Sequence, residues 1–507
     1  MSQDKINHAV KEWIAVLGRE NVIDDKKKLE LAGQATFATS TELSVIIRPM
    51  TVEQIQQCVR IANRFRVAIY PVSCGMNWGY GSACTPGRTP VLMQLHRCNQ
   101  ICGYNEKFSY VRIEPGVTFR QLNDFLVSKK SKMFLNCPGN SADSSIVGLT
   151  LERGLVPGPH ANRSQYASQF EVVLPDGNIL HTGLDRFGNL ATSSLFGQGL
   201  GPGIDSLFMQ SNLGIVTRMT VEIQPLPEYF QYFSFTMADK NALLEVIEKF
   251  RELKIQGVLG ESCAFFNDYR LASFVRRYPF KKTKGKTPLP EAQLKEIRDE
   301  LEGGQWYVEA AIEAYCEKDG LLKRKFVEKK LGNWADSVFW DKANSVSSFN
   351  NREMQSGLNS IYWRKTDDCI GSNDPHQDKC GVIWCVPVVP FEAEELSVCI
   401  ELIYRILREY GYEPGITIRC ISNRVLYVMP GIIYDRENHD EDQNAMDCYH
   451  HLLQDMSEKG FIPYRLGIQS MNSEFPYKDK SGTFFKTLKK ALDPENILAP
   501  GRYEFWD

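Results

Sequence analysis

The sequence lacks several patterns by which common protein classes are identified. Its 14 cysteines include no CxxC pair, which argues against a zinc ribbon and against a dense disulfide scaffold. Lysine plus arginine total 59 and aspartate plus glutamate total 62, so the net charge of -3 provides no field that would gather phosphate backbones or anionic lipid. We therefore expect reduced, mostly buried thiols, no metal site and no nucleic-acid partner.

Long apolar runs and two nucleotide-binding fingerprints are missing as well. The N-terminal residues mix charges where a secretory signal needs an apolar centre, and the most apolar later run, residues 381–391, is too short to span a bilayer. There is no GxxxxGK[ST] P-loop, and the stretch GQGLGPG at residues 197–203 has Pro202 where a dinucleotide fingerprint needs its final glycine. The sequence predicts a cytoplasmic protein without a membrane partner, and neither a P-loop ATPase nor a Rossmann enzyme.

The length and the order of local signals predict a protein of more than one domain. A chain of 507 residues is too long for one ordinary core, and 43% hydrophobic with 24% charged residues is a normal globular mixture. Helix and strand signals alternate at first, with capping boxes at Thr51 and Thr118. Long amphipathic helices follow Pro225. We predict a first domain over residues 1–225, completed by residues 460–507, and a second domain over residues 226–459.

The densest candidate chemistry lies in the loop PVSCGMNWGYGSA, residues 71–83, directly after a predicted strand. Its glycines allow positive φ angles and a close backbone approach, so that N–H groups can converge on a pyrophosphate. For this loop alone, a glycine-rich turn without a ligand is an equal alternative. Three later stretches also join small residues to apolar strands and favour a phosphate-bearing cofactor: IEPGVTFRQL at 113–122, CPGNSADSSIVG at 137–148 and QSNLGIVT at 210–217.

Taken in order, these segments resemble the FAD-binding family of vanillyl-alcohol oxidase and p-cresol methylhydroxylase. The likeness extends over nearly the whole chain, through ERG at 152–154, EVVLPDGNILHTG at 171–183, GVIWCVPVVP at 381–390, PYR at 463–465 and DPENILAPGR at 493–502. It implies an α+β fold in which an FAD-binding domain of the p-cresol methylhydroxylase (PCMH) type is covered by a cap of a sheet flanked by helices. It also implies an FAD-dependent oxidase or dehydrogenase, commonly a homodimer, that passes electrons to oxygen or to a protein acceptor.

The resemblance also implies which residues bind the cofactor. They are Ser73, Cys74, Gly75, Met76, Asn77, Trp78, Gly79, Tyr80, Pro115, Gly116, Cys137, Pro138, Gly139, Ser144, Ser145, Gly148, Gly154, His160, Gly214, Ile215, Val216, Tyr427 and Arg502. For His160, a purely structural role is the alternative to cofactor binding. Three modes of FAD attachment stay open: an O-tyrosyl bond at Tyr427, a cysteinyl bond at Cys137 as in berberine bridge enzyme relatives, or tight binding without a covalent bond.

Tyr80, Tyr464 and Arg465 match the phenol-oxygen clamp of that family. Ionising a phenol of reference pKa near 10 at pH 7 costs about 4 kcal/mol. A guanidinium about 4 Å from the oxygen supplies on the order of 4 kcal/mol at an effective dielectric constant near 20. The phenolate can then push electrons through the ring as hydride leaves the para-benzylic carbon for flavin N5, which produces a quinone methide. A para-substituted phenol or related aromatic alcohol is the predicted small-molecule substrate; simple packing and pairing with an acidic neighbour are the alternative for these residues.

One position departs from the family pattern. Vanillyl-alcohol oxidase has an acidic residue after the proline near N5, where this chain has Gly139. Asp143 is the candidate replacement as catalytic base, with a solvated loop carboxylate as the alternative reading. Gly139 therefore keeps a second function open, the oxidation of an amine, a hydroxy acid or a specialised-metabolite intermediate without a phenol. A third possibility is a catalytically silent flavin-fold binding protein.

Overall fold

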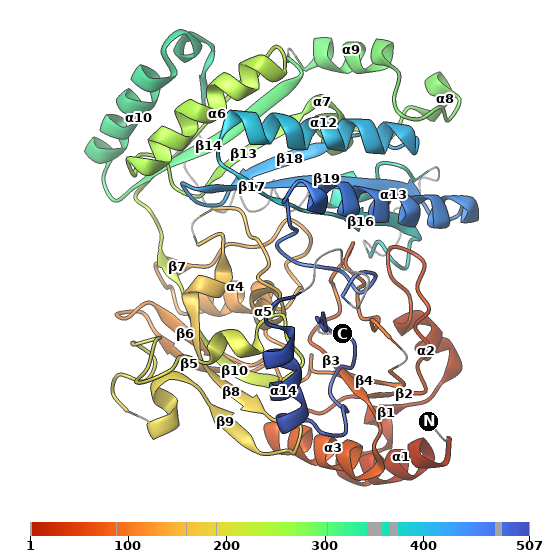
Figure 1. Ribbon diagram of the computed structural model, residues 1–507. Coiled ribbons are helices and arrows are strands. Elements are labelled where there is room, and N and C mark those ends of the chain that lie inside the picture. The colour runs from red at the N-terminus through yellow and green to blue at the C-terminus, as the bar shows by residue number, and fades with distance from the viewer. Residues whose placement is uncertain are drawn as a thin grey trace.

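The computed structural model describes residues 3–505 except 88, 159, 189, 302, 342–356, 366–373 and 472–478. Two halves lie one above the other in Figure 1. The lower half combines the N-terminal part of the chain with its C-terminal tail, and the upper half is built from the middle of the chain. The chain crosses from one half to the other between Pro225 and Tyr229.

The N-terminal sheet of the lower half has the strand order β1-β2-β4-β3. Its strands are β1 (Val22–Ile23), β2 (Val45–Ile47), β3 (Ile69–Val72) and β4 (Val91–Gln94), and its helices are α1 (Gln3–Leu17), η1 (Arg19–Asn21), α2 (Lys26–Ala32) and α3 (Val52–Phe65). The helix start predicted at Thr51 is confirmed, because its side chain accepts the Gln54 N–H at the start of α3. The Gln54 side chain in turn accepts the N–H of Met50, whereas a strict capping box would require that of Thr51. β3 and β4 run parallel, and the glycine-rich loop follows the carboxyl end of β3.

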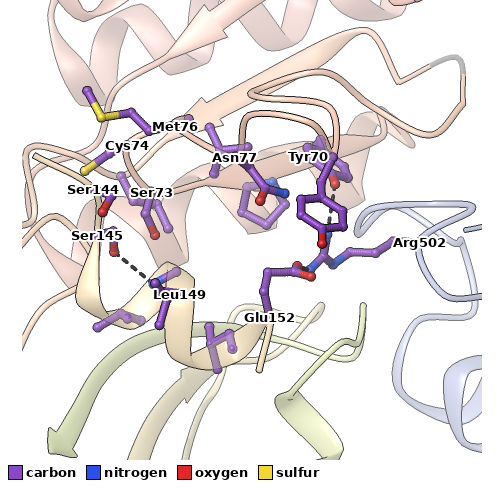
Figure 2. Close-up of a pocket in the computed structure, with 18 of the residues that line it drawn as sticks. Tyr70, Ser73, Cys74, Met76, Asn77, Ser144, Ser145, Leu149, Glu152 and Arg502 are labelled. Carbon is purple, nitrogen blue, oxygen red and sulfur yellow. Dashed lines mark hydrogen bonds and ion pairs between the residues drawn. The ribbon is translucent and has the colours of Figure 1, made fainter. Parts of the chain in front are cut away.

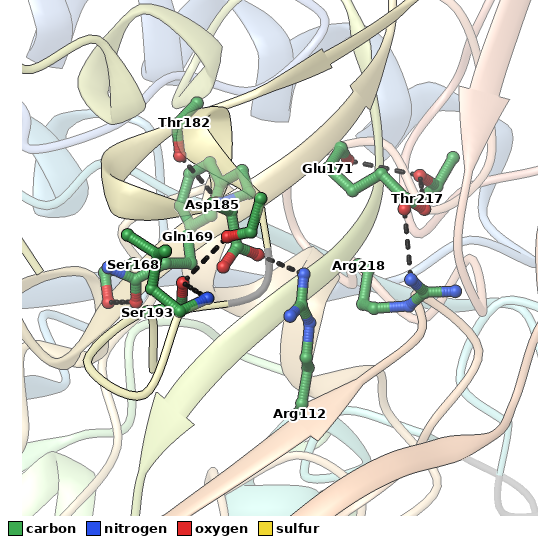
Figure 3. Close-up of polar contacts among 12 residues, drawn as sticks. Arg112, Ser168, Gln169, Glu171, Thr182, Asp185, Ser193, Thr217 and Arg218 are labelled. Atoms are coloured by element: carbon green, nitrogen blue, oxygen red, sulfur yellow. Dashed lines mark hydrogen bonds and ion pairs between the residues drawn. The ribbon is translucent and has the colours of Figure 1, made fainter. Parts of the chain in front are cut away.

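The second sheet of the lower half has the order β5-β6-β10-β8-β9. The elements of this region are β5 (Ile101–Asn105), β6 (Tyr110–Ile113), α4 (Phe119–Ser128), β7 (Met133–Phe134), α5 (Ile146–Leu151), η2 (Arg163–Tyr166), β8 (Ala167–Val173), β9 (Ile179–His181), η3 (Gly183–Phe187), η4 (Asp205–Phe208), β10 (Ile215–Glu222) and β11 (Gln224–Pro225). Thr118 caps α4 as predicted, by accepting the Gln121 N–H at 3.1 Å. Figure 3 shows two ion pairs on this sheet, Arg112 with Asp185 of η3 and Arg218 with Glu171. The first of them attaches the segment after β9 to the sheet.

The upper half is one large, mostly antiparallel sheet in the order β15-β12-β14-β13-β18-β19-β16, with β17 paired to β19. Its strands are β12 (Tyr229–Met237), β13 (Cys263–Asn267), β14 (Trp306–Ala314), β15 (Phe339–Trp340), β16 (Cys380–Trp384), β17 (Val388–Pro390), β18 (Ile416–Cys420) and β19 (Val425–Asp435). Its helices are α6 (Lys240–Ile255), α7 (Asp268–Val275), α8 (Phe280–Thr283), α9 (Glu291–Glu300), α10 (Glu317–Leu331), η5 (Gly332–Ser337), α12 (Ala393–Glu409) and α13 (His439–Glu458). In Figure 1, α6, α10, α12 and α13 lie on the side of the sheet away from the lower half.

Successive residues on a strand of the cap sheet point to opposite sides of that sheet. On β18, Ile416 and Ile418 belong to the apolar cluster that includes residues of α6 and α12. Thr417 and Arg419 alternate with these residues along the strand and line a cavity on the opposite side, toward the lower half, because successive side chains of a strand alternate. This places polar side chains at the boundary between the halves.

The C-terminal tail joins the two halves. Phe461 and Leu466 pack with the cap cluster, whereas Ile497 and Leu498, after α14 (Gly482–Leu492), pack with the N-terminal sheet. The predicted domain division at residues 225 and 460 stays a prediction. Among the described residues, no helix is long and apolar enough to cross a membrane, and no group of three His, Cys, Asp or Glu side chains could hold a metal ion.

Candidate functional site

The glycine-rich loop after β3 has the backbone that its sequence predicts. Gly75, Gly79 and Gly81 have φ angles of +73°, +79° and +119°. At Gly79, a Cβ atom would lie 2.0 Å from Cδ1 of Trp384, a residue of the cap. Glycine is therefore required there both by the left-handed backbone and by the close approach of the two halves.

This loop forms one wall of a cavity whose empty volume, counting the part open to solvent, is about 1160 Å³. In Figure 2, Ser73, Met76 and Asn77 lie across the cavity from Leu149 and Glu152. Fourteen residues predicted for cofactor or substrate binding line it: Ser73, Cys74, Gly75, Met76, Asn77, Tyr80, Ser144, Ser145, Gly148, Gly214, Ile215, Val216, Arg465 and Arg502. Segments far apart in the sequence thus meet around one space.

The C-terminal tail closes this first cavity through Arg502. Its guanidinium forms an ion pair with Glu152 and donates a hydrogen bond to Tyr70 Oη at 2.9 Å (Figure 2). The buried Lys489 pairs with Asp493 at 2.7 Å and donates to the carbonyl oxygens of Asn212, which precedes β10, and of Leu498 in the tail itself. Arg502 was predicted as a cofactor-binding residue; Glu152 and Tyr70 also line the cavity and were not predicted.

Buried polar atoms around the first cavity lack hydrogen-bond partners within the described protein. They are Ser82 Oγ, Asn140 Oδ1 and Arg465 Nε. Buried polar groups are almost always hydrogen-bonded, so these atoms indicate a ligand that carries donors and acceptors. A flavin dinucleotide has such groups on its ring edge, its ribityl chain and its pyrophosphate. The residues present therefore fit FAD.

A second cavity adjoins the first, with an empty volume of about 980 Å³ that also counts the part open to solvent. The two share six lining residues: Met76, Asn77, Tyr80, Asn140, Leu149 and Arg465. The cap supplies its other walls, through Phe266 of β13, Arg270 and Phe274 of α7, Ile361, Trp384 of β16, Thr417 and Arg419 of β18, and Met429 of β19. None of these cap residues was among the predicted site residues. Trp78, Pro138, Gly139, Gly154 and Tyr464 were predicted and line this second cavity only.

Arg465 lies where the two cavities meet. Its guanidinium carbon is 3.6 Å from the centre of the Tyr80 ring and 5.5 Å from that of Tyr464, and Nη1 donates to Asn77 Oδ1 at 3.2 Å. Burial, with Tyr464, raises the pKa of the Tyr80 phenol well above its ordinary value, although Arg465 opposes the shift. Burial acts to lower the pKa of Arg465, but Tyr464 and Tyr80 outweigh it and raise that pKa. A permanent cation thus lies beside a neutral hydroxyl donor, which suits an anionic oxygen.

The two candidates for covalent attachment line neither cavity. The Tyr427 ring stacks on that of Tyr464 with 4.5 Å between centroids. Cys137 packs against the apolar cluster of the second sheet. Burial raises the pKa of each to about 12, so both side chains are neutral at pH 7. Covalent attachment stays a prediction that these positions do not favour.

Gly79 of the glycine-rich loop lines neither cavity, and four further predicted residues lie away from both. Asp143 accepts two hydrogen bonds from Arg120, at 2.7 and 3.0 Å, and these lower the pKa of its carboxyl group. This placement does not support Asp143 as the catalytic base. The His160 ring stacks on Tyr166 with 3.4 Å between centroids, and burial lowers its pKa to about 3, which fits its structural alternative. Pro115 and Gly116 form the turn beneath α5, where the Pro115 carbonyl accepts a hydrogen bond from Ser145 at 2.6 Å.

Comparisons with known proteins agree with this geometry. A family model described as "FAD binding domain" matches residues 43–183. The chain is 36% identical over 532 residues to 1'-carboxy-chondrochloren decarboxylase of Chondromyces crocatus, covering 100% of this chain and 98% of that protein. It is 27% identical to the 4-cresol dehydrogenase [hydroxylating] flavoprotein subunit of Pseudomonas putida, covering 99% and 96%. The chain belongs to this family of FAD-dependent flavoproteins.

Solved structures of the family share the fold over the whole chain. p-Cresol methylhydroxylase with substrate bound superposes with a TM-score of 0.91 at 25% identity, covering 99% of this chain and 98% of that one. 4-Ethylphenol oxidase from Gulosibacter chungangensis superposes with a TM-score of 0.90 at 23% identity, covering 100% and 98%. The predicted α+β fold with an FAD-binding domain and a cap is therefore confirmed, as are the cofactor FAD and the assignment as an FAD-dependent oxidoreductase.

Proposed function

We propose that this flavoenzyme oxidises a para-substituted phenol, which binds in the second cavity with its oxygen against Arg465. The observation that carries the proposal is the position of Arg465, which lines both cavities and lies against the Tyr80 ring. FAD, when bound in the first cavity, would supply the two-electron acceptor for hydride from the para-benzylic carbon. The predicted clamp residues Tyr80 and Tyr464 complete the binding site for the phenol oxygen.

The clamp would act by stabilising the phenolate. Arg465 close to the oxygen supplies on the order of 4 kcal/mol, about what ionisation at pH 7 costs. Because burial keeps Tyr80 protonated, its hydroxyl can donate a hydrogen bond to that oxygen. The phenol loses its proton, the para-benzylic carbon loses hydride, and the substrate becomes a neutral quinone methide. Aromatic residues of the cap, Phe266, Phe274 and Trp384, would contact the ring and its para substituent.

A second candidate couples this oxidation to loss of carbon dioxide. The observation that favours it is the 36% identity to a protein named as a decarboxylase of a 1'-carboxy compound. If a carboxylate is attached to the carbon next to the oxidised one, the electrons of its C–C bond can form a new double bond while the ring regains its phenolate. The products are a vinylphenol, carbon dioxide and two-electron-reduced cofactor, so atoms and charge balance.

Electrons then pass from the reduced cofactor to oxygen or to a protein acceptor, as the resemblance implies. The Pseudomonas putida relative is named as a flavoprotein subunit, which implies a second subunit and so favours a protein acceptor. We also propose that the protein forms a homodimer and that it is located in the cytoplasm.

Anaerobic mixing of the holoenzyme with substrate panels tests the proposed function. A panel of 4-alkylphenols should bleach the flavin absorbance, and 3-(4-hydroxyphenyl)propanoate should bleach it with release of carbon dioxide if the second candidate holds. Bleaching by amines or hydroxy acids, with no response to any phenol, would replace the proposal by its non-phenolic alternative. A flavin that no panel bleaches would instead support a silent binding protein.

A further inference from the structure

The two cavities share one polar side chain that the phenol clamp does not use. Of the six described residues that line both cavities, three are the clamp residues Tyr80 and Arg465 and the residue Asn77, which accepts a hydrogen bond from Arg465. Two of the others are apolar. The sixth is Asn140, in the segment between β7 and α5. Its carboxamide group lies at the border between the two cavities.

Contacts from both halves of the molecule fix the orientation of this carboxamide. Asn140 Nδ2 donates a hydrogen bond to the carbonyl oxygen of Met76 at 3.1 Å. The bond distinguishes the two ends of the amide, because an oxygen in the place of Nδ2 would face another acceptor. From the cap, Gly357 packs so closely on the carbonyl oxygen of Gly139 that no room is left for a Cβ atom. The chain is thus held on both sides of the border.

The other end of the carboxamide, Asn140 Oδ1, is buried and has no hydrogen-bond partner within the described protein. Because buried polar atoms are almost always hydrogen-bonded, this oxygen indicates a ligand at the border. The anchors of Asn140 and of the clamp are neighbours in the chain. Met76 holds Asn140 and the next residue, Asn77, holds Arg465 (Figure 2). The free amide oxygen and the clamp cation therefore belong to the same part of the site.

The reacting carbon of the proposed substrate must lie at this border as well. A para-benzylic carbon in the second cavity gives up its hydride toward the first cavity, so it lies next to the residues that both cavities share. This step rests on the proposed function. As hydride leaves, the carbon becomes electron-poor, and the negative end of a fixed amide dipole stabilises such a carbon.

The quinone methide that results has three fates, which differ in their need for a proton acceptor. Water can add to the benzylic carbon, which forms a C–O bond and restores the phenol, but the attacking water must give up a proton. Loss of a proton from the next carbon gives a vinylphenol and also needs an acceptor. Loss of carbon dioxide from a carboxylate on that carbon needs none, because the electron pair of the broken C–C bond forms the new double bond.

A carboxamide oxygen accepts hydrogen bonds but takes up no proton at neutral pH. Among the described residues that line the two cavities, the one carboxylate is Glu152, which is paired with Arg502. We infer that Asn140 is a product-determining residue, whose Oδ1 faces the reacting carbon as an acceptor that removes no proton. The quinone methide is therefore not hydrated, and a substrate with a carboxylate one carbon further releases carbon dioxide.

Product analysis after a single anaerobic turnover of the holoenzyme tests this role. In water labelled with heavy oxygen, 3-(4-hydroxyphenyl)propanoate should give 4-vinylphenol and carbon dioxide. Asn140→Asp puts a base at the border, and a positioned base accelerates proton transfer by about 10²–10⁴-fold. The ratio of labelled benzylic alcohol to vinylphenol should therefore rise about tenfold or more, and further as rising pH ionises the new carboxylate. The matched control, Asn178→Asp, makes the same change in an exposed turn that lines neither cavity and should leave the ratio unchanged.

Binding of unreactive ligands tests the acceptor without turnover. 4-Hydroxybenzamide and 4-hydroxyacetophenone have no benzylic hydrogen and differ only by an amino group in place of a methyl group. Measured by calorimetry, the amide should bind about three- to tenfold more tightly, which is the size of one hydrogen bond. Asn140→Leu should remove this preference, whereas Asn140→Asp should keep it because the carboxylate also accepts. A merely structural role would change both affinities together.

The outcomes separate this inference from the proposed function. If no phenol reduces the flavin but Asn140→Leu still removes the preference for the amide, the phenol proposal falls and Oδ1 keeps its assignment as the acceptor at the border. If phenols reduce the flavin but the wild type forms mainly the alcohol or retains the carboxylate, or if Asn140→Asp forms no more alcohol than the wild type, the inference is overturned. It is also overturned if the preference for the amide survives in Asn140→Leu, which decides the matter should Asn140→Asp fail to fold.

Discussion

The two cavities of this protein are built in different ways. The first is lined largely by backbone and small side chains, among them Ser73, Gly75, Ser145 and Gly214, from short segments that follow or precede strands. The second is lined by large side chains that the cap sheet and α7 bring together, such as Trp384. The difference indicates that the cofactor is held by local chain conformation and the substrate by tertiary arrangement. Changes to the two regions should therefore have separable effects.

The largest expected effect is at Arg465, where the cavities meet. Arg465→Met should slow flavin reduction by phenols roughly a thousandfold, because about 4 kcal/mol of phenolate stabilisation is lost. FAD content, measured by absorbance, should change little, since the first cavity keeps its other contacts. Arg465→Lys, which retains a charge, should be less impaired. Loss of FAD in parallel with activity would show that the two cavities are not separable at this residue.

The second effect concerns the tail that closes the first cavity. Lys489→Met would leave the buried Asp493 carboxylate without its cation and should lower stability by about 3 kcal/mol. Because Arg502 lies on the same tail, FAD should dissociate more readily, while KM for phenols of the remaining holoenzyme is unchanged. The double variant with Asp493→Asn removes both charges and should recover much of the thermal stability. If the double variant lost as much stability as Lys489→Met alone, this account would be contradicted.

A third prediction concerns a glutamate outside both cavities. Burial, with Glu261, raises the pKa of Glu313 to about 7, although Ser262, Lys323 and Lys254 act in the opposite direction. Between the ordinary carboxyl value of 4.5 and about 7, the folded protein binds a proton that the unfolded chain does not, so stability should fall as pH rises through this window.

Glu313→Gln should flatten this dependence by about 2 kcal/mol, measured by denaturant unfolding between pH 5 and pH 8. Ligand affinities at both cavities should stay the same. An unchanged pH profile in the variant would show that Glu313 is not the titrating group.

The last prediction separates two glycines of the same loop by the cavity that each substitution affects. Gly75→Ala and Gly79→Ala each put a side chain at positive φ, which costs about 1 to 2 kcal/mol. At Gly75 the new Cβ would lie 3.2 Å from Ala83 Cβ, within the loop of the first cavity, so FAD affinity should fall. At Gly79 it would displace Trp384, so KM for phenols should rise instead. If FAD affinity and KM for phenols changed in the same way in both variants, the proposed distinction between the two cavities would be contradicted.

The sequence predicted the backbone of the glycine-rich loop and the helix caps for a physical reason. The positive φ angles at Gly75 and Gly79 and the caps at Thr51 and Thr118 depend on neighbouring residues, so they can be read from a local pattern. The large majority of the residues predicted from this loop and from the segments that meet it line one cavity or the other.

The second cavity could not be predicted in the same way. Its walls come from strands and a helix more than a hundred residues apart, such as Phe266 and Arg419. The alternation in ITIRC at residues 416–420 does indicate that Thr417 and Arg419 share one side of a strand. It does not tell whether that side faces solvent or a cavity. Asp143 is a further case in which the local sequence is not enough. Nothing in its own segment predicts the pairing with Arg120, which holds its carboxylate away from both cavities.

The most direct test of the central claim compares a 4-alkylphenol with its methyl ether in anaerobic stopped-flow reduction of the holoenzyme. The ether has the same shape beyond the oxygen but cannot ionise. We predict that the phenol bleaches the flavin and that the ether does not, and that Arg465→Met removes most of the difference. Equal rates for the phenol and the ether would contradict the proposal that Arg465 acts by stabilising a phenolate.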